Sequence, residues 1–172
     1  MSNKLKIGLI GLGTVGQGVV KVLDKYDDIE IICCAVNNLK KKRDVAIKNL
    51  TQDAMEIASN PEVDVVVEVA GGVKMLDVLM EAIKNKKHIV TANKELLARH
   101  GAALFDLARK NQVSILYEAA VAGGIPIIMP IKTTLSANEF TNVAGILNGT
   151  TNYILTKMEE ENLSYLDCLE KA

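Results

Sequence analysis

The sequence predicts a doubly wound α/β fold, in which helices cover both faces of a mostly parallel sheet. Two observations lead to this fold class. Short runs of β-branched residues alternate with amphipathic segments, and the first run ends in a glycine-rich turn. Alternating strands and helices are typical of parallel sheets joined by right-handed crossovers. With 49% hydrophobic and 24% charged residues, the 172-residue chain can build the buried core that such a sheet needs.

Five apolar runs are predicted to be strands, and VDVVVEV is the clearest because it is rich in valine. The predicted strands are residues 6–10, 29–36, 63–69, 88–91 and 113–117. Segments with apolar residues at helical spacing lie between them. Helices are therefore predicted over 14–25, 51–58, 74–85 and 94–110, the last with Gly101 as a potential break. The polar and basic segment 37–49 is predicted to be a loop.

The character of the sequence changes after Glu118. A stretch rich in small residues, with two prolines, precedes a strand-like run at 140–147 and a helix that begins near residue 148. A further helix begins in the last ten residues. We therefore assign residues 1–135 to a first domain and residues 136–172 to the beginning of a second, α+β domain.

Composition excludes several classes of protein. The formal net charge of −1 offers no electrostatic reason to bind nucleic acid or an anionic membrane. The three cysteines, two of them adjacent in an apolar run, do not form a disulfide framework. No apolar run approaches the length of a membrane span. We expect a soluble cytoplasmic protein that binds neither nucleic acid nor membrane.

The turn after the first predicted strand matches G-x-G-x-x-G at Gly11, Gly13 and Gly16. The first glycine allows a tight turn, the second lets the backbone approach a pyrophosphate, and the third lets the helix pack close to the strand. Backbone N–H groups at Thr14 and Val15 would then face the phosphates. This context predicts a Rossmann-type, dinucleotide-binding domain over residues 1–135.

The end of the second predicted strand bears on the choice of cofactor. An acidic residue that binds the ribose 2′-hydroxyl of NAD is expected there, but the sequence has Asn37, followed by a basic run that includes Lys40 and Arg43. This pattern favours NADP, or use of both NADP and NAD. The alternative is an ordinary solvated basic loop.

Ligands of open α/β sheets bind outside the carboxyl ends of the strands. Besides the glycine turn and Asn37, this edge is predicted to include cofactor contacts from Val69, Ala70, Gly71 and Thr91. Lys94 also lies there, in the first turn of a helix, where the helix dipole favours anions rather than cations. Lys94 is therefore a candidate catalytic and cofactor-binding residue, with an ordinary surface lysine as the alternative.

Five motifs in order, GLGTVGQGV, VEVAGG, TANKELLARHG, YEAAVAGGIPII and GILNGTTNYIL, resemble the successive signatures of homoserine dehydrogenase. The resemblance implies NAD(P)-dependent interconversion of L-aspartate 4-semialdehyde and L-homoserine, a step in threonine, methionine and isoleucine biosynthesis. It also implies a small-molecule substrate and a homodimer or homotetramer for the full-length form. The last three motifs are the most specific.

The same resemblance assigns roles to residues. It implies that Lys94 is the active-site lysine and contacts the substrate, and that Asn148, Gly149 and Thr150 line the substrate cleft. The structural alternative for the latter segment is a helix cap supplied by Thr150 or Thr151. His88 and His100 are interpreted as non-catalytic, His100 as exposed.

A monovalent cation site, for Na⁺ or K⁺, is also implied by the family. Its ligands would be the Glu118 side chain and the carbonyls of Val121, Gly123 and Ile125. Oxygen ligands suit such a hard cation. A half-buried carboxylate at a strand end is the alternative interpretation of Glu118.

The family has a larger substrate and dimerisation domain than residues 136–172 provide. We therefore expect a truncated chain that binds NAD(P) but has little or no dehydrogenase activity, with the strand near 141–147 exposing an edge and an apolar face. Two other functions stay open: another nicotinamide-dependent reductase of amino-acid or semialdehyde substrates, and a regulatory protein that binds nucleotides without catalysis.

Overall fold

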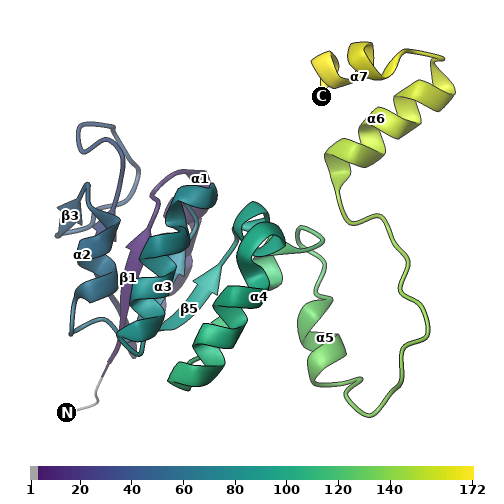
Figure 1. Cartoon of the computed structure of the whole chain (residues 1–172). Helices are drawn as coiled ribbons and strands as arrows, with labels where there is room; N and C mark the ends of the chain where they lie inside the picture. The colour runs from purple at the N-terminus through teal and green to yellow at the C-terminus, as the bar shows by residue number, and fades with distance from the viewer. Residues whose placement is uncertain (1–3) are drawn as a thin grey trace. The chain divides into compact units, whose positions relative to one another are not determined.

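The computed structural model describes residues 4–172 of the chain (Figure 1). The chain forms two compact units, one that ends at Ala120 and one that spans Val121–Ala172. This division comes earlier than the predicted domain boundary after residue 135. The assignment of residues 121–135 to the dinucleotide-binding domain stays a prediction.

The first unit contains a six-stranded sheet in the order β3-β2-β1-β4-β5-β6, and every strand pair is parallel. The strands are β1 (Leu5–Ile10), β2 (Ile29–Ala35), β3 (Leu50–Thr51), β4 (Val65–Glu68), β5 (His88–Thr91) and β6 (Ile115–Leu116). The predicted parallel sheet is confirmed. The short edge strand β3 was not predicted, because two residues are too few to show a periodic pattern.

Four α-helices connect these strands: α1 (Thr14–Leu23), α2 (Ala54–Ser59), α3 (Leu76–Lys84) and α4 (Lys94–Asn111). A short 3-10 turn, η1 (Val73–Met75), precedes α3, so the predicted helix at 74–85 begins in a tighter turn. Gly101 does not break α4. It is buried within this 18-residue helix, where a side chain at that position would meet Phe105.

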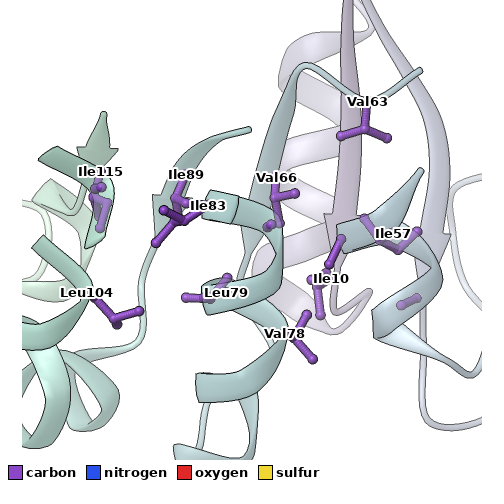
Figure 2. Packing of buried hydrophobic residues seen from close by; sticks show 14 of the residues in the cluster. Ile10, Ile57, Val63, Val66, Val78, Leu79, Ile83, Ile89, Leu104 and Ile115 are labelled. Carbon is purple, nitrogen blue, oxygen red and sulfur yellow. The ribbon is translucent and has the colours of Figure 1, made fainter. Parts of the chain in front are cut away.

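Alternate residues of the strands point into two separate cores. Ile10 and Val66 join a core with α2, α3 and α4, and Figure 2 shows that core. Leu9 and Val67, their neighbours in sequence, join the other core, to which α1 contributes Val20. The sheet is therefore apolar on both faces, as the doubly wound arrangement requires.

The second unit is helical. It contains α5 (Ile128–Lys132), α6 (Gly149–Glu160) and α7 (Tyr165–Lys171), and the 3-10 turn η2 (Glu118–Ala120) closes the first unit before it. The predicted strand at 140–147 is wrong: no strand forms there. An isolated extended segment has no partner for its backbone hydrogen bonds, so an apolar pattern alone does not make it a strand. Its apolar side chains are exposed, among them Ile146 at 72%.

Two further expectations concern the whole described chain. The three cysteines, which were not expected to form a disulfide framework, are all free and buried. Among residues 4–172, no helix combines the length and apolar character needed to cross a membrane.

The amino-terminal edge of the sheet contains a buried lysine that the sequence pattern does not reveal. Lys87, directly before β5, is 2% exposed. Its ammonium donates to the carbonyl oxygen of Val63 at 2.8 Å and to that of Asn60. Burial lowers the pKa of Lys87, because the charged form loses hydration. Lys87 therefore holds the turn between α2 and β4 at the cost of burying a charge.

Replacing Lys87 with methionine keeps an apolar stem but removes the ammonium that donates to the carbonyls of Val63 and Asn60, of which only the Asn60 carbonyl keeps another donor, the Val63 N–H at 3.2 Å. We expect Lys87→Met to lower the free energy of unfolding by about 1–3 kcal/mol in urea denaturation at pH 7. Wild type should gain stability relative to this variant as pH rises toward 10.5, because the unfolded chain then binds more protons than the folded chain. The exposed control Lys84→Met should change stability by less than about 0.5 kcal/mol. Equal losses in both variants would contradict the role given to burial.

Candidate functional site

The carboxyl ends of β1, β2 and β4 surround a pocket of about 590 Å³. Its walls come from the glycine turn, from the segment after β2 and from the segment after β4. The lining residues include Gly11, Leu12, Gly13, Asn37, Asn38, Lys41, Arg43, Gln52, Asp53, Val69 and Ala70. The pocket therefore lies where ligands of open parallel sheets bind.

The three glycines of the turn have different physical roles. Gly11 has a φ of 99°, and a Cβ there would come within 2.8 Å of the Ala70 nitrogen. A Cβ on Gly16 would lie 2.1 Å from the carbonyl oxygen of Gly11, so α1 approaches β1 too closely for any side chain. A Cβ on Gly13 would meet nothing within 4 Å. Gly13 thus leaves open the space through which a ligand can approach the backbone.

The beginning of α1 is chemically suited to an anion. Its N-cap is Gly13, which has no side chain to accept from the first-turn N–H groups, and the first turn contains no acidic residue. Thr14 and Val15 are exposed there. Because helix starts carry unpaired N–H groups and a positive dipole end, this arrangement fits a pyrophosphate.

The segment after β2 forms a basic wall of the pocket. The Arg43 guanidinium donates to the carbonyls of Asn38 at 2.7 Å and Lys41 at 2.8 Å, which folds the loop around it. Its Nε atom is buried and has no partner among the described residues. Asn37 is held by the Gln52 amide, which donates to its carbonyl at 2.8 Å. Lys41 lines the pocket and Lys40 does not, so the cofactor contact of Lys40 stays a prediction.

A buried polar network links the ends of β4 and β5. Glu68 and Thr91 are paired across the two strands, and the Thr91 hydroxyl donates to Glu68 at 2.7 Å. Thr91 is 1% exposed, so its side chain supports the edge from inside and does not line it. Glu68 was not predicted from the sequence, since one acid in a valine run shows no pattern. Its place at the strand end was the available signal.

Lys94 is the first residue of α4 and is exposed at the same edge of the sheet. The helix is capped by Asn93, whose side-chain oxygen accepts from the Leu96 N–H at 3.1 Å. Capping by Asn93 agrees with the predicted helix start. Lys94 thus follows a residue that is 4% exposed and fixed by hydrogen bonds.

The remaining predicted residues lie in or next to the second unit. Asn148 caps α6, because its side-chain oxygen accepts from the Thr151 N–H at 2.8 Å, so the alternative in which Thr150 or Thr151 supplies the cap is wrong. Gly149 and Thr150 form the exposed first turn of that helix. All three stay predicted substrate contacts.

The predicted cation ligands divide between the units. Glu118 lies in the first, whereas Val121, Gly123 and Ile125 lie in the second. The backbone at Gly123 is left-handed, with a φ of 60°. No cluster of three metal-binding side chains occurs among residues 4–172. The monovalent cation site stays a prediction.

The two histidines lie away from the pocket. His88 begins β5 at the opposite edge of the sheet, where its Nδ1 accepts from the Ser114 N–H at 3.1 Å. His100 lies on α4 and is half-buried rather than exposed as predicted, because it occupies the boundary of the face that packs on the sheet. Neither lines the pocket.

The parallel sheet, the glycine turn and the free beginning of α1 together define a dinucleotide-binding α/β protein. Comparison with known families gives the particular group. Residues 11–118 match the model for the homoserine dehydrogenase NAD binding domain, and residues 126–172 match the model for homoserine dehydrogenase. The chain belongs to the homoserine dehydrogenase family, which confirms the predicted resemblance.

Individual relatives agree. The homoserine dehydrogenase of Bacillus subtilis is 43% identical over 98% of this chain, which spans 42% of that protein. The crystal structure of a Thiobacillus denitrificans homoserine dehydrogenase superimposes with a TM-score of 0.87 at 40% identity, over 98% of this chain and 42% of that one. An archaeal homoserine dehydrogenase, solved in complex with NADPH, shares the fold with a TM-score of 0.81 at 22% identity, over 98% of this chain and 60% of its own.

The chain thus spans less than half the length of the curated relatives it matches. The expectation that these 172 residues alone have little or no dehydrogenase activity stays a prediction.

The glycine geometry predicts opposite effects for two substitutions in the same helix. Gly16→Ala forces backbone atoms apart and is expected to cost about 1–3 kcal/mol of unfolding free energy. Gly18→Ala adds a methyl group in open space on the exposed face of α1 and is expected to gain about 0.5–1 kcal/mol. Urea denaturation of the two variants measures both. A stable Gly16→Ala protein would show that the close approach of α1 to β1 is wrong.

Proposed function

We propose that this chain binds NAD(P) and serves the hydride transfer that interconverts L-aspartate 4-semialdehyde and L-homoserine. The observation that carries the proposal is the open backbone at Gly13, which precedes an uncapped helix start in a member of the homoserine dehydrogenase family. The pocket beside it, at about 590 Å³, is within the usual size range of small-molecule sites. The substrate is a small amino acid or its aldehyde.

In this proposal, different groups at the ligand-binding edge contact different parts of the dinucleotide. The first-turn N–H groups at Thr14 and Val15 bind the pyrophosphate. Asn37 and the basic wall bind the adenosine end, and Val69 and Ala70 contact the nicotinamide half across the turn. The bound cofactor supplies or accepts the hydride.

Lys94 is the proposed catalytic residue. Negative charge grows on the aldehyde oxygen as hydride reaches the carbonyl carbon, and an ammonium beside that oxygen stabilises it and supplies the proton. In the reverse direction, the same group accepts the proton of the alcohol. Asn148, Gly149 and Thr150 are proposed to hold the polar groups of the substrate.

We propose that the pocket binds NADP in preference to NAD. The residues directly after β2, Val36 to Asn38, include no carboxylate to pair with a ribose 2′-hydroxyl, and the pocket carboxylate of Asp53 caps α2, whereas Lys41 and Arg43 line the pocket. A 2′-phosphate there would be attracted by the positive charges of these two side chains. Lys40 adds positive charge nearby.

Further parts of the proposal rest on membership of the homoserine dehydrogenase family. A Na⁺ or K⁺ ion would be held by Glu118 and by the carbonyls of Val121, Gly123 and Ile125. We propose that the protein works in the cytoplasm as a homodimer or homotetramer and binds no nucleic acid.

Titration with NADPH, followed by fluorescence, tests the proposed cofactor site. Gly13→Ala is expected to weaken binding at least tenfold, about 1.4 kcal/mol, because its methyl group occupies the space that the pyrophosphate needs. Gly18→Ala is the matched control, and its affinity should equal that of wild type. Lys94→Ala should keep most of the affinity, since its proposed role is in proton transfer. Wild-type protein that does not bind NADPH would disprove the proposal.

The proposed preference for NADP is tested by replacing two neighbouring lysines, one that lines the pocket and one that does not. Lys41→Ala removes one cation from the pocket, and Lys42→Ala removes one that does not line it. We expect Lys41→Ala to weaken NADPH binding about tenfold, the value of one charge-assisted hydrogen bond, without changing NADH binding. Lys42→Ala should change neither affinity by more than about twofold, the range expected for a screened surface charge. Equal loss of NADH and NADPH binding in Lys41→Ala would rule out a 2′-phosphate contact.

A further inference from the structure

A completely buried carboxylate lies at the ligand-binding edge of the sheet. Glu68 is the last residue of β4 and is 0% exposed. Among the described residues it takes part in no ion pair. A buried charge without a counterion is costly unless hydrogen bonds satisfy it. The hydrogen-bond donors around the Glu68 carboxylate therefore indicate its role.

Three donors satisfy the carboxylate of Glu68. Oε1 accepts from the backbone N–H of Ala70 at 3.0 Å and of Gly71 at 2.8 Å. Oε2 accepts from the hydroxyl of Thr91 at 2.7 Å. One side chain thus holds both the turn that follows β4 and the end of β5.

The network continues from Thr91 to the beginning of α4. The Thr91 hydroxyl oxygen accepts from the Asn93 N–H at 3.0 Å. The Asn93 amide donates to the carbonyl of Gly72 at 2.9 Å, while its oxygen caps α4. Residue 93 is therefore fixed to both strand ends, and Lys94 is the next residue along the chain.

The hydrogen bonds to Glu68 also decide what the turn after β4 can offer a ligand. The N–H groups of Ala70 and Gly71 point to the carboxylate, and that of Val69 donates to the Ile10 carbonyl at 2.9 Å. No backbone donor of these three residues is left for a phosphate. Their carbonyl oxygens remain, and a carbonyl accepts from hydroxyl or amide donors such as those of a ribose or a carboxamide.

We propose that Glu68 is a positioning residue that fixes the turn at residues 69–72 and the start of α4 in the geometry that binds the nicotinamide half of the cofactor and places Lys94. This inference rests on the proposed cofactor binding. Glu68 acts through Thr91, Asn93 and the two backbone amides and does not touch the cofactor. Phosphate is bound at α1, whereas the turn after β4 binds hydroxyl or amide donors.

Two pairs of variants separate positioning from general stability. Thr91→Val removes the hydroxyl that links Glu68 to Asn93, and Thr91→Ser keeps that hydroxyl. Glu68→Gln keeps the size of the side chain and can still accept from both backbone amides. Its NH₂ group, however, donates to the Thr91 oxygen and leaves the Thr91 proton without an acceptor. Glu62→Gln is the matched control, because Glu62 is exposed and pairs with Lys6 away from the pocket.

The first measurement uses the 172-residue chain without ligand. Amide hydrogen exchange by ¹H–¹⁵N NMR reports on Ala70, Gly71 and Leu96. We expect exchange at Leu96 to accelerate about tenfold or more in Thr91→Val and Glu68→Gln, and to stay within about twofold of wild type in Thr91→Ser and Glu62→Gln. Unchanged protection at all three amides in both disruptive variants would overturn the proposal.

The second measurement compares NADPH affinity with urea stability for the same proteins. Positioning predicts that Thr91→Val and Glu68→Gln weaken NADPH binding about fivefold or more, and that Thr91→Ser restores it. Variants that lose stability but bind NADPH like wild type would show a merely structural role and overturn the proposal. If Glu68→Gln does not fold, the Thr91→Val and Thr91→Ser pair decides.

The two proposals can fail separately. If wild-type chain binds no NADPH, the proposed function and the affinity part of this inference are both overturned. Hydrogen exchange then decides alone whether Glu68 fixes the start of α4. If wild type binds NADPH and the variants match it in exchange and affinity, only the role of Glu68 is overturned.

Discussion

A parallel sheet that is buried on both faces leaves only the ends of its strands for polar chemistry. In β1, Leu9 and Ile10 point into opposite cores, and in β4 Val66 and Val67 do the same. A charged side chain within these stretches would lie in one core or the other without hydration. The first polar group that β4 can carry is Glu68, where the strand ends. The position of the candidate site follows from this constraint.

The edge created in this way is not chemically uniform. At the beginning of α1, the backbone offers free N–H groups next to the open space at Gly13. At the end of β4, Glu68 takes up the N–H groups of Ala70 and Gly71. One part of the edge therefore suits an anion, and the other suits donors. A dinucleotide has both kinds of group, a charged pyrophosphate and a neutral nicotinamide ribose.

Close packing and ligand binding place different demands on the same turn. Gly16 is required because α1 approaches the Gly11 carbonyl, and Gly11 is required because its φ is positive and Ala70 lies against it. Gly13 has no such structural need. The proposed cofactor binding accounts for its freedom from contact, which makes it the most informative of the three glycines.

Much of this molecule was determined by local sequence. The alternation of apolar runs predicted the parallel sheet, and the spacing of Gly11, Gly13 and Gly16 predicted the turn, because both patterns lie within a few neighbouring residues. The helix start at Asn93 and Lys94 was likewise visible in one short segment. The strand predicted at 140–147 failed, since a strand needs a partner that local sequence cannot supply.

Only the tertiary structure decided which residues from distant parts of the sequence lie side by side. Glu68 meets Thr91 because β4 and β5 pair in parallel with these two residues in register, although 23 positions separate them in the chain. Likewise, Arg43 donates to the carbonyls of Asn38 and Lys41 and so holds the loop that lines the pocket, a closure that the basic run does not reveal. A pattern along the chain records the period of an element, whereas register and loop closure depend on contacts between distant residues. For that reason the sequence located the ligand edge, and only the fold showed how Glu68 holds it.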